Sequence, residues 1–267
     1  MKVTDYDKAP GHWIFAQMGK RVLRPGGKEL TQALIKNLDI QPSDNVIEFA
    51  PGLGYTANLA LQNHPSTYIG VDVDSEAITR LTKKMGGSNR RFVNGNAGKV
   101  DLVEGSSTKL YGEAMLTMHA DHRKTEIIRE AYRLLEPGGM YAIHELGLAP
   151  DSIDPAIKKE IQQDLAKSIR VNARPLTVDE WTKLLEDEGF EIIFSKTNGM
   201  HLLENKRVLD DEGFFRTLKI GYNVLTHPKA RKRILEMRKV FRTHEKHMNA
   251  VVLVAKKYNY NADINQD

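Results

Sequence analysis

Short apolar runs alternate along the middle of the chain with longer stretches that mix apolar and polar residues. The apolar runs have the length and composition of strands, which we expect at residues 45–49, 67–72, 91–93, 113–117 and 140–145. The stretches between them repeat apolar positions at helical spacing, which predicts helices at residues 56–63, 75–85 and 123–135. Strands that alternate with helices are typical of right-handed βαβ units, so the pattern predicts an α/β fold with a parallel sheet.

The last part of the chain continues this alternation. We expect a helix at residues 178–188, because Thr177 is a good N-cap and Glu180 occupies the capping-box position. Two further strands are expected at residues 190–195 and 250–256. The predicted sheet therefore has seven strands.

Three segments lie outside the alternation. The N-terminal residues 1–40 predict helices at 12–24 and 28–38, and the segments 150–176 and 200–247 interrupt the later strands with further helical patterns. In open α/β sheets, ligands bind beyond the carboxyl ends of the strands. We therefore expect the two later segments to form a helical cap over that edge of the sheet.

Composition excludes several kinds of chemistry. The 267 residues are 40% hydrophobic and 28% charged, as in an ordinary globular domain. The absence of cysteine excludes disulfides, zinc–thiolate sites, iron–sulfur clusters and thiol catalysis. No apolar run approaches the roughly 20 residues that span a bilayer, and the polar N-terminus has no targeting features. We expect a cytoplasmic protein without a membrane partner.

Positive charge is concentrated in one helical segment. Residues 206–247 contain twelve Lys/Arg and five Asp/Glu, whereas the formal net charge of the whole chain is only +4. Such a segment attracts anionic partners, but a solvated helix face has the same pattern. Because neither stacking aromatic residues nor a recognised module accompanies the charge, we do not expect a nucleic-acid partner.

The stretch from Val46 to Ala57 carries the clearest functional signal. A predicted strand ends there in a turn that contains Gly52 and Gly54, and a helix follows. The two glycines let a ligand approach the backbone, and the helix N-terminus supplies free N–H groups. Asp72 ends the next strand, where its carboxylate is able to accept hydrogen bonds from ribose hydroxyls. These features predict a nucleoside cofactor.

The order of these features resembles the class I S-adenosylmethionine-dependent methyltransferases. The first motif of that family is an acidic residue followed by spaced glycines, which here is Glu48 followed by Gly52 and Gly54. Ala50 occupies a position where the family most often has glycine. Since a Cβ atom disfavours a positive φ, we expect the backbone of Ala50 to be right-handed or extended.

Later motifs agree with the same resemblance. The acid of the family's second motif holds the ribose and matches Asp72, which Val73 follows. The third motif commonly reads Gly-Asp-Ala and contacts the adenine amino group, and here Asn96 and Ala97 stand in it. Asparagine keeps a carbonyl acceptor for that amino group. The turn at residues 135–139 is similar to the family's turn before its fifth strand.

The resemblance implies a Rossmann-like, seven-stranded, mostly parallel sheet with helices on both faces. It implies S-adenosylmethionine as the cofactor and S-adenosylhomocysteine as the product. The cofactor domain would comprise residues 41–149 and 177–257. Residues 1–40 would then form an N-terminal helical lid, and the cap segments would cover the acceptor site.

The catalytic residues are less clear, because methyl transfer needs a base only when the acceptor must lose a proton. His119 follows the fourth predicted strand and Glu145 ends the fifth, so both are candidate bases at the same edge of the sheet. As an alternative role at this edge, Glu113 on the fourth predicted strand would face the cofactor. Asp121 and His122 lie next to His119, but three adjacent polar residues after a strand are typical of an ordinary loop, so we predict no metal site.

The leading hypothesis is a methyltransferase that acts on a small molecule, as a monomer or homodimer. An RNA methyltransferase is an alternative, because residues 48–56 are also similar to the loop of the adenine-N6 ribosomal RNA dimethylases. That family's Asn/Asp-Pro-Pro-Tyr-type motif is absent after the fourth strand. A nicotinamide dehydrogenase would also satisfy the glycine pattern with Asp72. A non-catalytic cofactor-binding protein is the fourth possibility.

Overall fold

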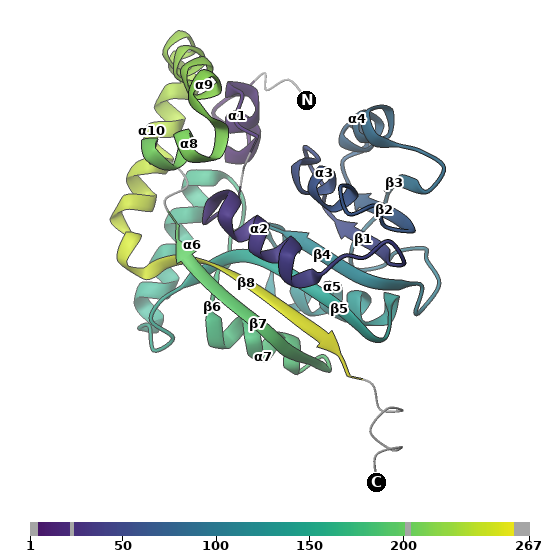
Figure 1. The fold of residues 1–267 in the computed structure, drawn as a ribbon. Coiled ribbons are helices and arrows are strands. Elements are labelled where there is room, and N and C mark those ends of the chain that lie inside the picture. The colour runs from purple at the N-terminus through teal and green to yellow at the C-terminus, as the bar shows by residue number, and fades with distance from the viewer. Residues whose placement is uncertain (1–4, 22–23, 201–203, 259–267) are drawn as a thin grey trace.

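Eight strands form one sheet within residues 5–21, 24–200 and 204–258, the parts of the chain that the computed structural model describes (Figure 1). They are β1 (Asn45–Phe49), β2 (Thr67–Asp72), β3 (Arg90–Asn94), β4 (Ser107–Glu113), β5 (Leu135–Leu148), β6 (Leu176–Thr177), β7 (Phe190–Gly199) and β8 (Met248–Lys257). Their order in space is β3-β2-β1-β4-β5-β8-β7, and β6 pairs with β5. All neighbours are parallel except β8, which runs antiparallel between β5 and β7. The predicted Rossmann-like α/β fold is confirmed.

The sheet has one strand more than the seven expected, because β5 continues past Glu145 to Leu148. At this end of β5, Gly147 and Leu148 pair with the two residues of β6 on one side and with β8 on the other. The sequence had placed Glu145 at the end of this strand, but Glu145 lies within it.

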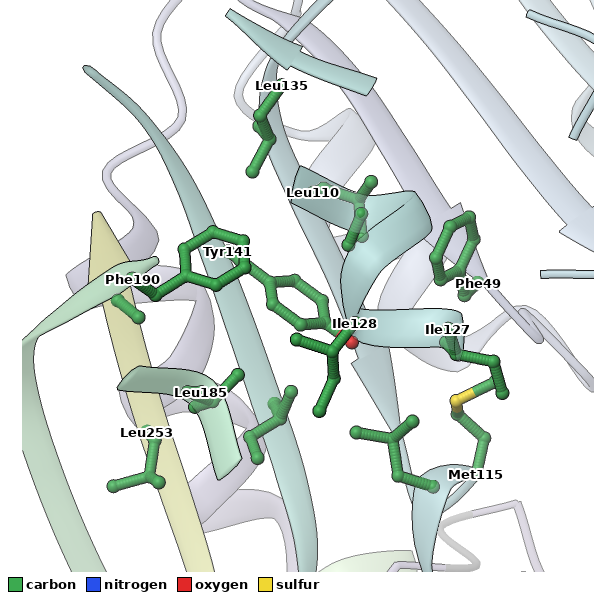
Figure 2. Close-up of a cluster of buried hydrophobic side chains, with 14 of the residues drawn as sticks. Phe49, Leu110, Met115, Ile127, Ile128, Leu135, Tyr141, Leu185, Phe190 and Leu253 are labelled. Atoms are coloured by element: carbon green, nitrogen blue, oxygen red, sulfur yellow. The ribbon is translucent and has the colours of Figure 1, made fainter. Parts of the chain in front are cut away.

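Helices cover both faces of the sheet, as expected. One face is covered by α2 (Gly27–Leu38), α3 (Tyr55–Leu61) and α4 (Ser75–Met85), and the other by α5 (Asp121–Leu134) and α7 (Val178–Glu186). Figure 2 shows the second interface, where Phe49 and Tyr141 of the sheet lie beside Ile127 and Ile128 of α5. Each fully buried side chain of this size stabilises the fold by roughly 1.5–3 kcal/mol. The two apolar layers hold the strand ends in fixed positions.

Two predicted helix starts are confirmed by their capping bonds. Thr177 Oγ1 accepts a hydrogen bond from Glu180 N at 3.2 Å, and Glu180 Oε2 accepts one from Thr177 N at 2.8 Å, which completes the capping box of α7. Asp74 begins α4 by accepting bonds from the backbone N–H groups of Glu76 and Ala77. Asp74 is thus fixed as a cap.

A group of helices lies beyond the carboxyl ends of β4 and β5 (Figure 1). It consists of α1 (Gly11–Met18), α6 (Pro155–Ile169), α8 (Asn205–Glu212), α9 (Phe214–Thr226) and α10 (Pro228–Thr243), which we call the helical cap. α10 is the central member, because it packs on α1, α6 and α9. Within the described residues, no helix combines the length and apolar character needed to cross a bilayer.

The first helix is shorter than the predicted one at 12–24. α1 ends at Met18, because Gly19 takes a left-handed conformation with φ 105° and turns the chain. Residues 22–23, which the prediction included, lie outside the described part of the chain.

The predicted strand at 113–117 is also wrong in its position. β4 is earlier and ends at Glu113, and Ala114 then turns the chain with φ 52°. Leu116–Met118 form a single 3-10 turn. This turn places the loop after β4 under the helical cap.

Candidate functional site

The glycine loop after β1 is built on left-handed backbone. Ala50, Gly52 and Gly54 have φ values of 54°, 54° and 75°. The expectation for Ala50 was therefore wrong: the turn requires the left-handed region, and Ala50 N is held by a 2.8 Å bond to Val71 O. An L-residue in this region costs roughly 1–2 kcal/mol. The position that departs from glycine is thus a strained one.

The two glycines of the loop have different reasons for lacking a side chain. A Cβ on Gly54 would lie 2.5 Å from the side chain of Leu81 and 2.6 Å from that of Met85, both on α4. Gly54 therefore allows α4 to pack closely on the loop. A Cβ on Gly52 would meet only Ala50 O, at 3.8 Å, and Gly52 lines an open cleft.

Asp72 connects the end of β2 to the glycine loop. Its Oδ2 accepts a hydrogen bond from Gly52 N at 3.2 Å, and its Oδ1 accepts one from Asp74 N at 3.0 Å. Asp72 and Val73 both line the same cleft as Gly52, and Val73 is 74% exposed. The structure therefore brings together Ala50, Gly52, Asp72 and Val73 of the predicted cofactor residues. The cleft has a volume of about 330 Å³.

On the other side of β1, the cleft is lined by a buried charged network, in which Glu113, an alternative named from the sequence, is joined by Arg24, which was not predicted. Arg24 Nε lies 2.5 Å from Glu113 Oε2, and both residues line the cleft. Glu113 also accepts bonds from Thr31 Oγ1 at 2.7 Å and from Thr56 Oγ1, and His144 Nδ1 lies 2.8 Å from its Oε1. Burial raises the pKa of Glu113, but Arg24, His144 and Thr56 outweigh burial and hold the pKa at about 2. Glu113 is therefore an anion paired with a cation.

Glu48 does not line this cleft. Its side chain points into the core under α2 and α3, where it accepts hydrogen bonds from Tyr68 Oη and, at 2.9 Å, from Tyr111 Oη. Burial raises the pKa of Glu48 to about 7, although both tyrosines and Arg24 oppose the rise. Its contacts are those of a core residue that joins β1 to β2 and β4, not of a cofactor ligand.

Glu145 is fully buried and both its oxygens are occupied. It accepts bonds from the backbone N–H groups of Met115, Leu116 and Thr117 and from Thr117 Oγ1, at 2.7–3.0 Å. Burial raises the pKa of Glu145, and these four donors oppose the rise. The contacts correct its predicted role as a base, because they make it the residue that holds the loop after β4 in shape.

The remaining predicted residues lie outside the lining of the cleft. His119 follows the 3-10 turn and lines neither the cleft nor the cavity described below, and burial, Arg123 and Lys124 lower its pKa. Asn96 and Ala97 follow β3. The carbonyl oxygen of Asn96 already accepts bonds from Gly98 N at 2.9 Å and from Arg123 at 3.1 Å. That oxygen is therefore not the free acceptor that the sequence suggested.

A second cavity adjoins the cleft under the helical cap. The two share His12, Ala114 and Met118, and the cavity continues to Leu165 of α6 and Phe241 of α10. Its volume is about 70 Å³. We call it the acceptor-side cavity.

The lining of the acceptor-side cavity is almost entirely apolar. Among the described residues that line it, only His12 and Thr117 carry polar side chains. Thr117 Oγ1 is already bonded to Glu145. No described residue forms a hydrogen bond with the ring of His12, and burial lowers the pKa of that ring. His12 is therefore a neutral imidazole between the two spaces.

His12 was not among the site residues predicted from the sequence. A signal was present, because His12 interrupts the apolar run from Gly11 to Phe15. Arg24 was also missed, although it directly precedes the Pro-Gly-Gly turn at 25–27.

One cluster of potential metal ligands occurs among the described residues. Single ligand atoms of Glu160, Asp164 and His244 lie within 4.8 Å of one another, at the contact between α6 and α10. His244 Nε2 is already 2.9 Å from Asp164 Oδ2. This pair joins α6 to the residue that follows α10, and none of the three residues lines the cleft or the acceptor-side cavity.

Comparison with known proteins identifies the family. A family model described as a methyltransferase domain matches residues 46–139, which contain the glycine loop and Asp72. An uncharacterized protein of Haemophilus influenzae is 31% identical over 252 residues, which are 92% of this chain and 98% of that protein. The methyltransferase domain of this chain belongs to the class I S-adenosylmethionine-dependent family. Its cofactor is S-adenosylmethionine, so the dehydrogenase hypothesis is set aside.

Two solved structures share the fold of this methyltransferase. One is Haemonchus contortus phosphoethanolamine N-methyltransferase 2 in complex with phosphomonomethylethanolamine and S-adenosylhomocysteine, with a TM-score of 0.69 and 16% identity over 93% of this chain and 57% of that chain. The other is the [4+2]-cyclase SpnF, with a TM-score of 0.68 and 13% identity over 93% of this chain and 92% of that chain. One fold thus carries more than one reaction, so the acceptor must be argued from the site.

Proposed function

We propose that the protein transfers the methyl group of S-adenosylmethionine to a small, largely apolar acceptor that occupies the acceptor-side cavity. The observation that carries the proposal is the junction of two unlike spaces at His12, Ala114 and Met118. One space is a cleft over the glycine loop whose lining includes charged side chains, and the other is a cavity under the cap whose lining is almost entirely apolar. A methyl group carried in the first would face an acceptor held in the second.

The polar groups of the cleft fit the cofactor. Asp72, at the end of β2, would hold the ribose hydroxyls, with Ala50 and Gly52 beside it and Val73 against the base. Arg24, on the other side of β1, would hold the carboxylate of the amino-acid end, and Glu113 would fix the guanidinium group of Arg24 in place. Asn96 and Ala97 remain predicted contacts to the adenine. Because the side-chain oxygen of Asn96 is already bonded, its amide NH₂ is the group that would donate to the adenine.

The acceptor-side cavity argues against a strongly anionic acceptor. The Haemonchus contortus enzyme was solved with phosphomonomethylethanolamine, which carries a phosphate. Among the described residues that line the cavity here, none is Lys or Arg, so a phosphate would lose its hydration without gaining a cation. An apolar acceptor with one O–H or N–H group fits the lining better. The same enclosure argues against RNA, which needs an open basic surface.

His12 is the group we propose as general base. When bound, S-adenosylmethionine supplies an electrophilic methyl group for an in-line displacement. Methylation of an O–H or N–H acceptor releases a proton, which the neutral ring of His12 would accept at a nitrogen that bonds no described residue. Glu145 would act indirectly, by fixing the loop that carries Ala114 and Met118.

The acceptor class is tested by incubating the protein with methyl-labelled S-adenosylmethionine and separate pools of acceptors. The pools are small apolar alcohols, phenols and amines, phosphate-bearing amines, and total RNA. We expect label only in the apolar pool. Label in RNA, or in the phosphate-bearing amines alone, contradicts the proposal.

The role of His12 is tested with His12→Ala. Removal of a general base lowers kcat by about 10²- to 10⁴-fold, and binding of S-adenosylhomocysteine should not change. Because burial lowers the pKa of His12, wild-type kcat should fall only as the pH drops below 6.5. The matched control is His122→Ala, since His122 is exposed on α5 and lines neither space. Equal kcat values for the two variants would remove His12 from the mechanism.

A further inference from the structure

The outer face of α9 is apolar, which is the reverse of the usual arrangement in a surface helix. Phe214, Phe215, Leu218, Tyr222 and Leu225 are 61%, 85%, 57%, 68% and 66% exposed. Their positions along α9 place them on one side of the helix, and we call them the α9 apolar face. No residue of α9 is buried. Figure 1 shows α9 at the outer end of the cap, away from the sheet.

The α9 apolar face is large for a protein of this size. With roughly 200 Å² for a fully exposed large apolar side chain, the five fractions correspond to about 670 Å². The largest apolar patch of a typical monomer is roughly 300–600 Å², and patches of this size usually mark a binding surface. A Cβ added at Gly221, within this face, would meet no atom within 4 Å, so the face is open along its length.

The charged residues of α9 and of the first part of α10 are all positive. Residues 214–235 contain six Lys/Arg and no Asp/Glu. Lys219 on α9 is exposed, as are Lys229, Arg231 and Lys232 where α10 begins, and none of these four forms an ion pair with a described residue. Of the remaining two, Arg216 lies 4.0 Å from Glu212, and Arg233 lies 3.8 Å from Glu236. The unpaired charges on α9 and at the start of α10 are therefore cationic.

We propose that the α9 apolar face docks on an anionic lipid surface. An amphipathic helix with Phe, Tyr and Leu on one side and cations beside them binds at the boundary between headgroups and acyl chains. Each nearby Lys or Arg adds attraction to anionic lipids. A second copy of the chain fits less well, because a two-fold contact over this face would bring the cations of α9 and α10 in one copy towards the same cations in the other. The composition led us to expect no membrane partner, but it excluded only spanning segments.

Docking through α9 would hold the helical cap at the membrane. α9 packs on α1 and α10, which both line the acceptor-side cavity. An apolar acceptor dissolved in the bilayer would then have a short path to the cavity. This last step rests on the proposed function, whereas docking itself does not.

The proposal is tested by sedimenting the full chain with vesicles. One set is phosphatidylcholine alone, and the other is equal parts of phosphatidylcholine and phosphatidylglycerol. We expect sedimentation with the anionic vesicles only, and weaker sedimentation at high salt. Wild-type protein that stays in the supernatant with anionic vesicles overturns the proposal, and so does equal binding to both sets.

Two matched pairs of variants locate the surface. Phe215→Glu should reduce binding by about tenfold or more, because a charge replaces the most exposed anchor. Val103→Glu, at a valine that is 77% exposed in the loop between β3 and β4, should leave binding unchanged. Lys219→Glu should weaken binding by about fivefold or more, and Lys84→Glu, on α4, should not. Equal effects within either pair overturn the proposal.

Two further measurements separate the possible outcomes. Sedimentation equilibrium without vesicles shows whether the protein dimerises, and a dimer that Phe215→Glu dissociates would make a second copy the occupant of the face, which also overturns the proposal. S-adenosylhomocysteine binding, measured on the same samples, checks that each variant is folded. It also separates a failure of docking from a failure of the proposed function.

Discussion

Replacement of Glu48 by Gln should change how the stability of the protein depends on pH. Glu48 is 2% exposed, and its carboxylate is held by the hydroxyls of Tyr68 and Tyr111. A glutamine keeps the size of the side chain and a carbonyl oxygen that both tyrosines are able to bond. The substitution therefore removes the titration of Glu48 while keeping its contacts.

The magnitude follows from the shift in pKa. Burial raises the pKa of Glu48 from 4.5 to about 7 in the folded protein. The folded state thus binds a proton more tightly than the unfolded state, and the resulting stability is full below pH 4.5 and is lost as the pH rises through 7. A shift of this size corresponds to a loss of about 3 kcal/mol, at about 1.4 kcal/mol for each pH unit. The variant should not show this loss.

The assay is urea unfolding of both proteins at a series of pH values from 4.5 to 8.5. The difference in the free energy of unfolding between wild type and Glu48→Gln cancels the titration of all other groups. We expect the two proteins to be about equally stable at pH 4.5, and the variant to be more stable by about 3 kcal/mol above pH 8. In a protein that keeps Glu48, Tyr111→Phe should move the loss of stability to higher pH, because it removes a donor that favours the ionised carboxylate of Glu48.

Glu191→Gln is the matched control, since Glu191 is exposed on β7. It should follow the wild-type curve at every pH. A difference between wild type and Glu48→Gln that stays constant with pH, or that favours wild type at high pH, would refute the reasoning.

Two further substitutions test the loops of the site. Ala50→Gly should keep or raise stability, by up to about 1 kcal/mol, because it relieves the left-handed strain at a smaller entropic cost. Ala50→Val should lower stability clearly, and a stable valine variant in urea unfolding would show that the strain is absent. Glu145→Gln should destabilise the protein by about 1–3 kcal/mol, because an amide NH₂ would face backbone donors. Unchanged urea unfolding of this variant would contradict the proposed role of Glu145.

The fold was predictable from the sequence because its signals are local. β-branched runs, helical spacing and the capping box each act within about ten residues, and Thr177 begins α7 as predicted. Strand ends were less predictable, because they depend on distant partners. β5 extends past Glu145 only because β6 and β8 pair with it there.

The same dependence on distant partners explains which residues of the candidate site were predicted from the sequence and which were not. Gly52 and Asp72 act through their own turn and were identified from it. Glu48 was assigned to the cleft because it precedes the loop, but the strand directs its side chain to the face where Tyr68 and Tyr111 lie. His12 reaches the site only through the packing of α1 on other cap helices, and no local pattern encodes that packing.

The central claim is that the cleft over the glycine loop binds the cofactor through Asp72. Isothermal titration calorimetry with S-adenosylhomocysteine tests this claim most directly, on wild type, Asp72→Ala and the control Asp187→Ala, since Asp187 lies beyond α7 and lines no part of the cleft. We predict that wild type and the control bind the ligand. Binding should be weaker by about tenfold or more in Asp72→Ala, because the two charge-assisted hydrogen bonds from the ribose hydroxyls are lost. Absence of wild-type binding at millimolar ligand, or equal affinity in all three proteins, would contradict it.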